Sequence, residues 1–364
     1  MRVFRIALTG DFLDESGESA YGDLGLSRLK DSGLVQYRFL RDQAPRPGDR
    51  SYWDSFYAME VQPRHLAEID GLIVLRPWIK RAAFAEGAAE LAVIGRSGAG
   101  YDKIDVAACT DHDVALFNAP LALNHSTASS ALLFMLALAK RLPEQERVAR
   151  AGDWRAQASV MGGELQGRTL GIVGLGHSGR ELVRLVAPFE MRVIAYSPHA
   201  DGSQAAALCV ELTSLEELMR EADFVSLHSR LTPENRGLIG APQLALLKPT
   251  AYFVNIARGE LVDQAALVEL LGSRRIAGAA LDVFEREPLP ADDPLIGLDN
   301  VILTPHWNAS TSDVWRGASQ AMAAGMLCAA QGQIPENVVN REVLDRPGFQ
   351  AKLARFAENR AFVR

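Results

Sequence analysis

Short apolar runs alternate with segments of helical spacing along nearly the whole chain. The runs predict strands near residues 3–10, 71–76, 91–97, 114–120, 169–176, 192–197, 224–229, 251–257, 276–284 and 300–306. Many of them are continuously apolar, as is typical of parallel strands buried on both faces. Strands alternating with helices in this way predict a doubly wound α/β fold.

Ten predicted strands and one glycine-rich turn in mid-chain indicate two domains. We predict two doubly wound parallel-sheet domains, a Rossmann nucleotide domain over 118–306 and a flavodoxin-like substrate domain formed by 1–117 and 307–364. The helical segment 310–332 is expected to pack back on the first domain, so that two crossovers form a hinge. The stretch 45–55, "PRPGDRSYWDS", predicts an exposed loop.

Composition narrows the function only by exclusion. With 364 residues, a net charge of −7 and no long basic tract, the chain is not expected to bind nucleic acid. Three widely spaced cysteines indicate neither a disulfide framework nor a metal site. No signal-peptide core is visible, and the longest apolar run, 131–139, is far shorter than a membrane span. We therefore expect a cytoplasmic protein without a membrane partner.

The stretch "GLGHSG" carries the strongest binding signal. Gly174 allows a tight turn, Gly176 lets a phosphate approach the backbone, and Gly179 lets the following helix pack on the strand. His177 and Ser178 open that helix, whose N-terminus offers amides to a pyrophosphate. Because a strand precedes the turn and a helix and strand follow it, the motif predicts dinucleotide binding.

The next strand does not settle which dinucleotide is bound. NAD sites usually place an acidic residue at its end to grip the ribose, and here that position is Ser197. Asp201 lies beyond a proline, and His199 is the one basic candidate in "SPHAD" for a 2′-phosphate. The choice between NAD and NADP stays open, with a slight preference for NAD.

Three further strand ends carry residues suited to hydride transfer to a 2-oxo acid. Arg258 and Glu287 each follow an apolar run, His306 ends another, and Asp282 lies near the end of the run that precedes Glu287. An arginine can pin a carboxylate and polarise the neighbouring carbonyl. A histidine can donate a proton to the forming alkoxide, and a paired carboxylate keeps that histidine protonated. Each residue alone has an ordinary structural explanation, but the combination at strand ends favours catalysis.

These motifs, taken together, resemble the D-isomer-specific 2-hydroxyacid dehydrogenase family. The resemblance covers roughly residues 60–340 and rests on "GRSGAGYDKIDV", "GRTLGIVGLGHSGRELVR", "HSRLTPENRGLIG", "FVNIARGELVD", "AALDVFEREPLP" and "VILTPHWNAST". It implies that Arg258 binds the substrate carboxylate and carbonyl, and that His306, oriented by Glu287, is the proton donor.

The resemblance also implies binding residues and an oligomer. The backbone amides of Ala99 and Gly100 would hold the substrate carboxylate, while Asp282 and Ala257 would lie at the nicotinamide and Ser229 elsewhere along the cofactor. A homodimer would form through the apolar helix at 129–141. The chain departs from the family at Ser197, at Arg230 (where a proline is common) and at the helix start near 126–133.

Other functions remain open at this point. A formate dehydrogenase shares the fold but pairs its histidine with a glutamine, unlike Glu287. A non-catalytic, dinucleotide-sensing protein of the corepressor type could retain all three catalytic residues. A hydrolase of the adenosylhomocysteine type would not explain them. Arg76 could face an anionic substrate group or serve a loop, with the loop favoured, and the substrate itself is not readable.

Overall fold

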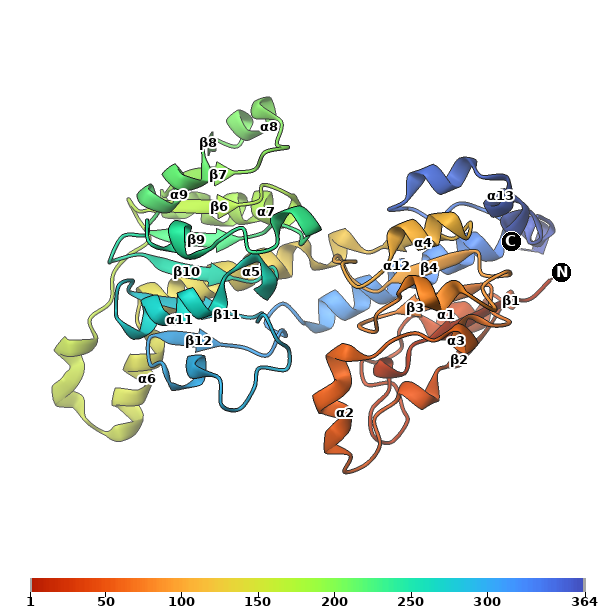
Figure 1. Cartoon of the computed structure of the whole chain (residues 1–364), viewed down its shortest axis with the longest axis horizontal. Coiled ribbons are helices and arrows are strands. Elements are labelled where there is room, and N and C mark those ends of the chain that lie inside the picture. The colour runs from red at the N-terminus through yellow and green to blue at the C-terminus, as the bar shows by residue number, and fades with distance from the viewer. Residues whose placement is uncertain (1, 363–364) are drawn as a thin grey trace. The chain divides into compact units, whose positions relative to one another are not determined.

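The computed structural model describes residues 2–362, and the chain divides into two compact units. The first contains 1–123 and 311–364, and the second contains 124–310. The chain thus crosses after Leu123 and Ser310, whereas the predicted crossings follow residues 117 and 306. Each unit is an α/β structure built on one parallel sheet (Figure 1).

The first unit has a sheet of order β2-β1-β3-β4-β5, all of whose pairs are parallel. Its strands are β1 (Phe4–Leu8), β2 (Val35–Phe39), β3 (Gly71–Val74), β4 (Val93–Arg96) and β5 (Ala115–Asn118). Its helices are α1 (Leu26–Asp31), α2 (Arg50–Ser55), α3 (Pro63–Leu66), α4 (Val106–Asp111), α12 (Ser312–Ala330) and α13 (Pro347–Ala354). The strand order is the flavodoxin-like one.

Both faces of this sheet are buried, which explains its continuously apolar strands. On one face Phe4, Ile6 and Leu8 pack with Met322 and Met326 of α12. On the other face lie side chains such as Leu72 and Ile94. The segment 310–332 therefore does pack on the first unit, as predicted. The predicted loop at 45–55 is wrong in its second half, because Asp49 caps α2 and Tyr52 is buried.

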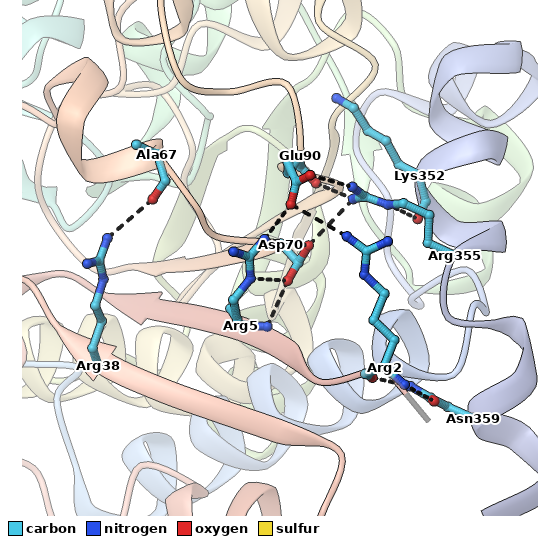
Figure 2. Close-up of polar contacts among 9 residues, drawn as sticks. All are labelled: Arg2, Arg5, Arg38, Ala67, Asp70, Glu90, Lys352, Arg355 and Asn359. Atoms are coloured by element: carbon cyan, nitrogen blue, oxygen red, sulfur yellow. Dashed lines mark hydrogen bonds and ion pairs between the residues drawn. The ribbon is translucent and has the colours of Figure 1, made fainter.

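The C-terminal segment is tied to the amino edge of the first sheet by charged groups. The buried carboxylate of Asp70 accepts hydrogen bonds from the backbone N–H and Nε of Arg5, at 2.9 and 3.1 Å, and pairs with Arg355 at 3.5 Å (Figure 2). Glu90 joins the same two arginines and Arg2 (Figure 2). These contacts join the charged C-terminal segment to the first sheet through Arg355.

The second unit has a parallel sheet of order β12-β11-β10-β9-β6-β7-β8. Its strands are β6 (Thr169–Val173), β7 (Arg192–Tyr196), β8 (Glu211–Leu212), β9 (Phe224–Leu227), β10 (Tyr252–Asn255), β11 (Gly278–Leu281) and β12 (Val301–Leu303). Its helices are α5 (Pro120–Ala139), α6 (Leu142–Ala151), α7 (His177–Val186), α8 (Gly202–Ala207), α9 (Leu215–Glu221), α10 (Ala241–Leu244) and α11 (Gln264–Gly272). Apolar clusters cover both faces of the sheet.

Two helices of this unit have unusual surfaces. By length and composition α5 could cross a membrane, but Phe134, Met135 and Leu138 are buried in the core beside β6. In contrast, α6 and the 3₁₀ segment η5 (Trp154–Val160) contain no buried residue. Trp154 is 67% exposed and Met161, just beyond η5, is 75% exposed. This pair of segments is named the 142–161 arm below.

We predict that Asp70→Asn destabilises the first unit. The substitution removes the charge that two arginines share, and a hydrogen bond to a charged group contributes about 1.5–3 kcal/mol. The expected loss is about 2 kcal/mol, measured as a shift of the urea unfolding midpoint. Glu90→Gln is the matched control, because Glu90 is 43% exposed and its ion pairs are worth about 1 kcal/mol or less. Equal effects of the two variants would contradict this account of Asp70.

Candidate active site

The carboxyl ends of the parallel strands bring the predicted site residues of the second unit to one edge. Along that edge His306 follows β12, Asp282 and Glu287 follow β11, and Arg258 follows β10. The glycine turn follows β6, two strands further on. In doubly wound sheets this edge borders the ligand crevice. The structure thus places the candidate acid–base residues and the candidate nucleotide-binding turn along the same edge of the sheet.

The turn after β6 has the steric properties that a dinucleotide requires. Gly174 has φ 101°, and a Cβ there would overlap Ser229. A Cβ on Gly179 would overlap the carbonyl of Gly174, so only glycine lets α7 approach the strand. A Cβ on Gly176 would meet nothing within 4 Å, although this residue caps the exposed start of α7. The open space at Gly176 and the α7 amides fit a pyrophosphate.

The end of β7 offers no free carboxylate for a ribose. Ser197 follows the strand, and Asp201 is the N-cap of α8, accepting from the backbone N–H of Ser203 at 2.8 Å. Arg180, in the first turn of α7, donates to Gln204 of α8 at 2.9 Å. A guanidinium therefore lies beside the segment that follows Ser197.

His228 is a residue near the turn that sequence reasoning missed. Its Nδ1 lies 3.1 Å from the Ser178 hydroxyl and its Nε2 lies 3.0 Å from the Ser226 hydroxyl. Burial lowers the pKa of His228 to about 4, so the imidazole is neutral at pH 7. The neighbouring Ser229 donates to the Val173 carbonyl at 3.2 Å and thereby stabilises the glycine turn that begins after Val173. A histidine directly after the apolar run 224–227 was the available signal.

Arg258 is held by the loop that follows β10. Asn255 bridges the loop, accepting from the N–H of Ala257 at 3.0 Å and donating to the carbonyl of Arg258 at 2.9 Å. Next in the chain is Gly259, where a Cβ would overlap the backbone of Phe284 and Glu285. Glycine at this position lets the loop after β10 lie directly against the loop after β11, which carries Glu287.

Glu287 and His306 are in direct contact. His306 Nδ1 lies 2.8 Å from Glu287 Oε2, and the other carboxylate oxygen accepts from the N–H of Phe284 at 3.1 Å. Burial alone would raise the pKa of Glu287, but the hydrogen bond and charge of His306 outweigh it and hold that pKa below its ordinary value, with a smaller contribution from Arg258. Glu287 is therefore a carboxylate at neutral pH, paired with the imidazole.

Asp282 holds the loop that carries His306. Its Oδ1 accepts from the Thr304 hydroxyl at 2.6 Å and from the N–H groups of Trp307 and Asn308 at 2.9 and 3.1 Å. Burial raises the pKa of Asp282, although these hydrogen bonds favour the carboxylate. His306 itself has φ 52°, a conformation unfavourable by about 1–2 kcal/mol for an L-residue. The Asp282 contacts offset this cost and fix the imidazole beside Glu287.

Ala99 and Gly100 belong to the first unit and follow β4. The loop begins at Gly98, whose φ is 143°, and Asn118 anchors it by donating to the Ala99 carbonyl at 2.7 Å. Among residues 2–362, the backbone N–H groups of Ala99 and Gly100 donate to no protein acceptor. Two such amides could bind a carboxylate.

Comparison with known proteins identifies the family. Residues 132–308 match the model of the D-isomer specific 2-hydroxyacid dehydrogenase NAD binding domain. A glyoxylate reductase of Korarchaeum cryptofilum is 39% identical over 331 residues, covering 90% of this chain and 96% of that protein. The chain belongs to the D-isomer specific 2-hydroxyacid dehydrogenase family. It is an NAD(P)-dependent D-2-hydroxyacid dehydrogenase with an NAD(P)-binding domain.

Two further relatives show the range of this dehydrogenase family. A D-3-phosphoglycerate dehydrogenase of Methanocaldococcus jannaschii is 43% identical over 256 residues, covering 70% of this chain. The chain spans only 48% of the length of that relative. The crystal structure of a glyoxylate reductase from Paecilomyes thermophila superposes with a TM-score of 0.78 at 26% identity, covering 94% of this chain and all of that one.

We predict that Gly176→Ala leaves the dehydrogenase folded but weakens cofactor binding. The new methyl group meets no protein atom within 4 Å, yet it occupies the space through which a phosphate approaches the backbone. Fluorescence titration with NADH and NADPH in parallel is expected to show an affinity loss of about tenfold or more, with an unchanged melting temperature. Gly237→Ala is the matched control, since a Cβ there is also unobstructed, although its positive φ costs some stability. Unchanged affinity in Gly176→Ala would contradict the assignment of the turn.

Proposed function

We propose that this enzyme reduces a small 2-oxo acid to the D-2-hydroxy acid, with His306 as the proton donor. The contact between His306 and the ionised Glu287 supports this proposal most directly. Bound NADH or NADPH supplies the hydride. The protein's own residues bind the oxo acid, polarise its carbonyl and deliver the proton.

The proposed roles follow from the chemistry of each group. Arg258 presents a delocalised cation that can bind a carboxylate and polarise the adjacent carbonyl oxygen. The amides of Ala99 and Gly100 are proposed to hold the same carboxylate. His306 donates its proton to the carbonyl oxygen as negative charge develops there, and Glu287 stabilises the protonated imidazole beforehand. Substrates of the glyoxylate type fit this minimal set, because they need no side-chain pocket.

The cofactor residues are assigned on the same basis. Gly174, Gly176, His177, Ser178 and Gly179 are proposed to surround the pyrophosphate, and Ser197 to contact the ribose. Ala257 and the second oxygen of Asp282 are proposed to contact the nicotinamide, with Ser229 beneath the turn. Because Asp201 caps α8 and Arg180 lies beside the ribose segment, we propose that NADPH is accepted as well as NADH.

The rival functions differ in what they require of Glu287. Formate oxidation delivers no proton to a substrate oxygen, so it has no use for a carboxylate that keeps the histidine protonated. A non-catalytic sensor would bind dinucleotide without turning over any 2-oxo acid. Robust reduction of any small 2-oxo acid by the wild-type enzyme would exclude the sensor, and no turnover of glyoxylate or of larger oxo acids with either cofactor would overturn the proposed reaction. The cytoplasmic location also stays a prediction.

We predict that Glu287→Gln makes reduction more sensitive to alkaline pH. The variant removes the negative charge that lies beside the proposed proton donor and favours its cationic form, so the alkaline limb of the kcat/KM profile is expected to move to lower pH. His306→Asn is expected to lower kcat by roughly a hundredfold to ten-thousandfold while cofactor affinity is kept. Glu285→Gln, an exposed neighbour, is the control. An unmoved profile in Glu287→Gln would refute the pairing.

We also propose a homodimer through the second unit. The 142–161 arm has no core of its own, and its exposed Trp154 and Met161 form the kind of surface that is normally covered by a partner. Leu133 of α5, within the helix predicted to pair, is 51% exposed as well.

We predict that Trp154→Asp shifts the enzyme from dimer to monomer. The substitution places a charge where the proposed interface would bury a large aromatic side chain. Such side chains commonly contribute about 2 kcal/mol or more to the free energy of association. Light scattering at micromolar concentration would show a mass falling from twice that of the chain to that of one chain. Ile334→Asp is the matched control, since Ile334 is a comparably exposed apolar residue of the first unit. A wild-type monomer would rule the dimer out.

A further inference from the structure

The carboxyl edge of the first sheet holds a buried arginine that is already neutralised. Arg76 follows β3, and its side chain is 12% exposed. The fully buried carboxylate of Asp11, which follows β1, lies 3.7 Å from the guanidinium and accepts the backbone N–H of Arg76 at 3.0 Å. The Thr9 hydroxyl donates to the same carboxylate at 2.6 Å. The carboxylate of Asp11 thus balances the positive charge of Arg76 inside the protein.

Aromatic side chains also contact the guanidinium of Arg76. Its guanidinium lies 4.8 Å from the centre of the Phe56 ring, and Nη1 is 3.5 Å from the Tyr21 hydroxyl. Phe56 begins the 3₁₀ segment η3 (Phe56–Ala58), which continues directly from α2. Arg76 therefore packs among the folded loops of the first unit, with its guanidinium already in contact with a carboxylate and an aromatic ring.

The segment that covers Arg76 is rich in aromatic residues. Tyr52, Trp53, Phe56 and Tyr57 lie on α2 and η3, with neighbouring ring centres 5.0–5.4 Å apart. Trp78 joins them by donating from Nε1 to the Tyr57 carbonyl at 3.2 Å. These five side chains are called the aromatic cluster. Tyr52 and Phe56 are buried, whereas Trp53 is 49% exposed and forms the accessible side of the cluster.

The aromatic cluster is fastened to the loop that carries Ala99 and Gly100. Lys103, three residues beyond Gly100, donates from Nζ to the Tyr57 carbonyl at 2.9 Å. The same ammonium lies 5.1 Å from the Tyr57 ring centre and 5.5 Å from that of Trp78. Cation–π contacts of this kind hold the cluster against the loop. The aromatic cluster and the loop that carries Ala99 and Gly100 are therefore joined within the first unit.

We propose that the aromatic cluster recognises the side chain of the 2-oxo acid, and that the enzyme prefers substrates with an aromatic or branched apolar side chain over phosphorylated ones. This inference rests on the proposed function. A substrate whose carboxylate is bound by the Ala99 and Gly100 amides would extend its side chain along a surface that offers Trp53 as an apolar partner. A phosphate there would meet aromatic rings and an arginine that Asp11 already neutralises.

The test is a comparison of kcat/KM for four oxo acids: glyoxylate, phenylpyruvate, 4-methyl-2-oxopentanoate and 3-phosphohydroxypyruvate. Apolar contacts of this size discriminate by about tenfold or more. We expect phenylpyruvate and 4-methyl-2-oxopentanoate to exceed 3-phosphohydroxypyruvate by at least that factor. A preference for 3-phosphohydroxypyruvate would overturn the inference while leaving the reaction intact. No turnover of any of the four with either cofactor would overturn the reaction itself and the inference with it.

Variants locate the effect on Trp53. In Trp53→Ala the ratio of kcat/KM for phenylpyruvate to that for glyoxylate is expected to fall about tenfold, mainly through KM. Trp53→Phe should restore most of the ratio, since it retains an aromatic face. Tyr37→Ala is the matched control, because Tyr37 is an exposed aromatic on the edge strand β2. An unchanged ratio in Trp53→Ala, or an equal fall in Tyr37→Ala, would refute the proposal.

Discussion

Parallel pairing of every strand in the second sheet is the constraint on which the proposed chemistry depends. It brings the carboxyl ends of β12, β11, β10 and β6 to one edge, so residues up to 132 positions apart in sequence, from Gly174 to His306, share that edge. Crossover helices make such pairing possible and bury both faces of the sheet. The loops beyond the edge are then free to carry polar groups, because the core no longer depends on them.

Those loops are held in place by buried polar contacts as much as by packing. Asp282 binds three donors of the loop around His306, and Asn255 closes the loop around Arg258. Gly259 removes the one side chain that would keep the two neighbouring loops apart. The imidazole and the carboxylate of Glu287 thus meet at 2.8 Å without relying on a ligand to assemble them.

The sequence predicted the buried strands well and the exposed edge strands poorly. Ten apolar runs correspond to strands, but β2 and β8 were missed, because each lies at the edge of its sheet and is largely exposed. No run of apolar residues marks "VQYRF" or "EL". The helix α2 was also missed, because it is short and because prolines, a glycine and charged residues surround it in the sequence. Arg258, Glu287 and His306 could be found because each follows a strand. The hydrogen bonds by which Asp282 holds the loop around His306 could not, since they join segments distant in sequence.

The discontinuity of the first unit has a consequence for how the protein is made. Residues 124–310 form the second unit, so its core is complete once that stretch has left the ribosome. The first unit, although it begins the chain, must wait for α12 and α13 to cover Phe4, Ile6 and Leu8. Asn359 then exchanges two hydrogen bonds with the backbone of Arg2, which joins the C-terminal helical turn to the segment just before β1. The core of the first unit can therefore be completed only after residues 124–310 have been synthesised, although its first strands precede them in the chain.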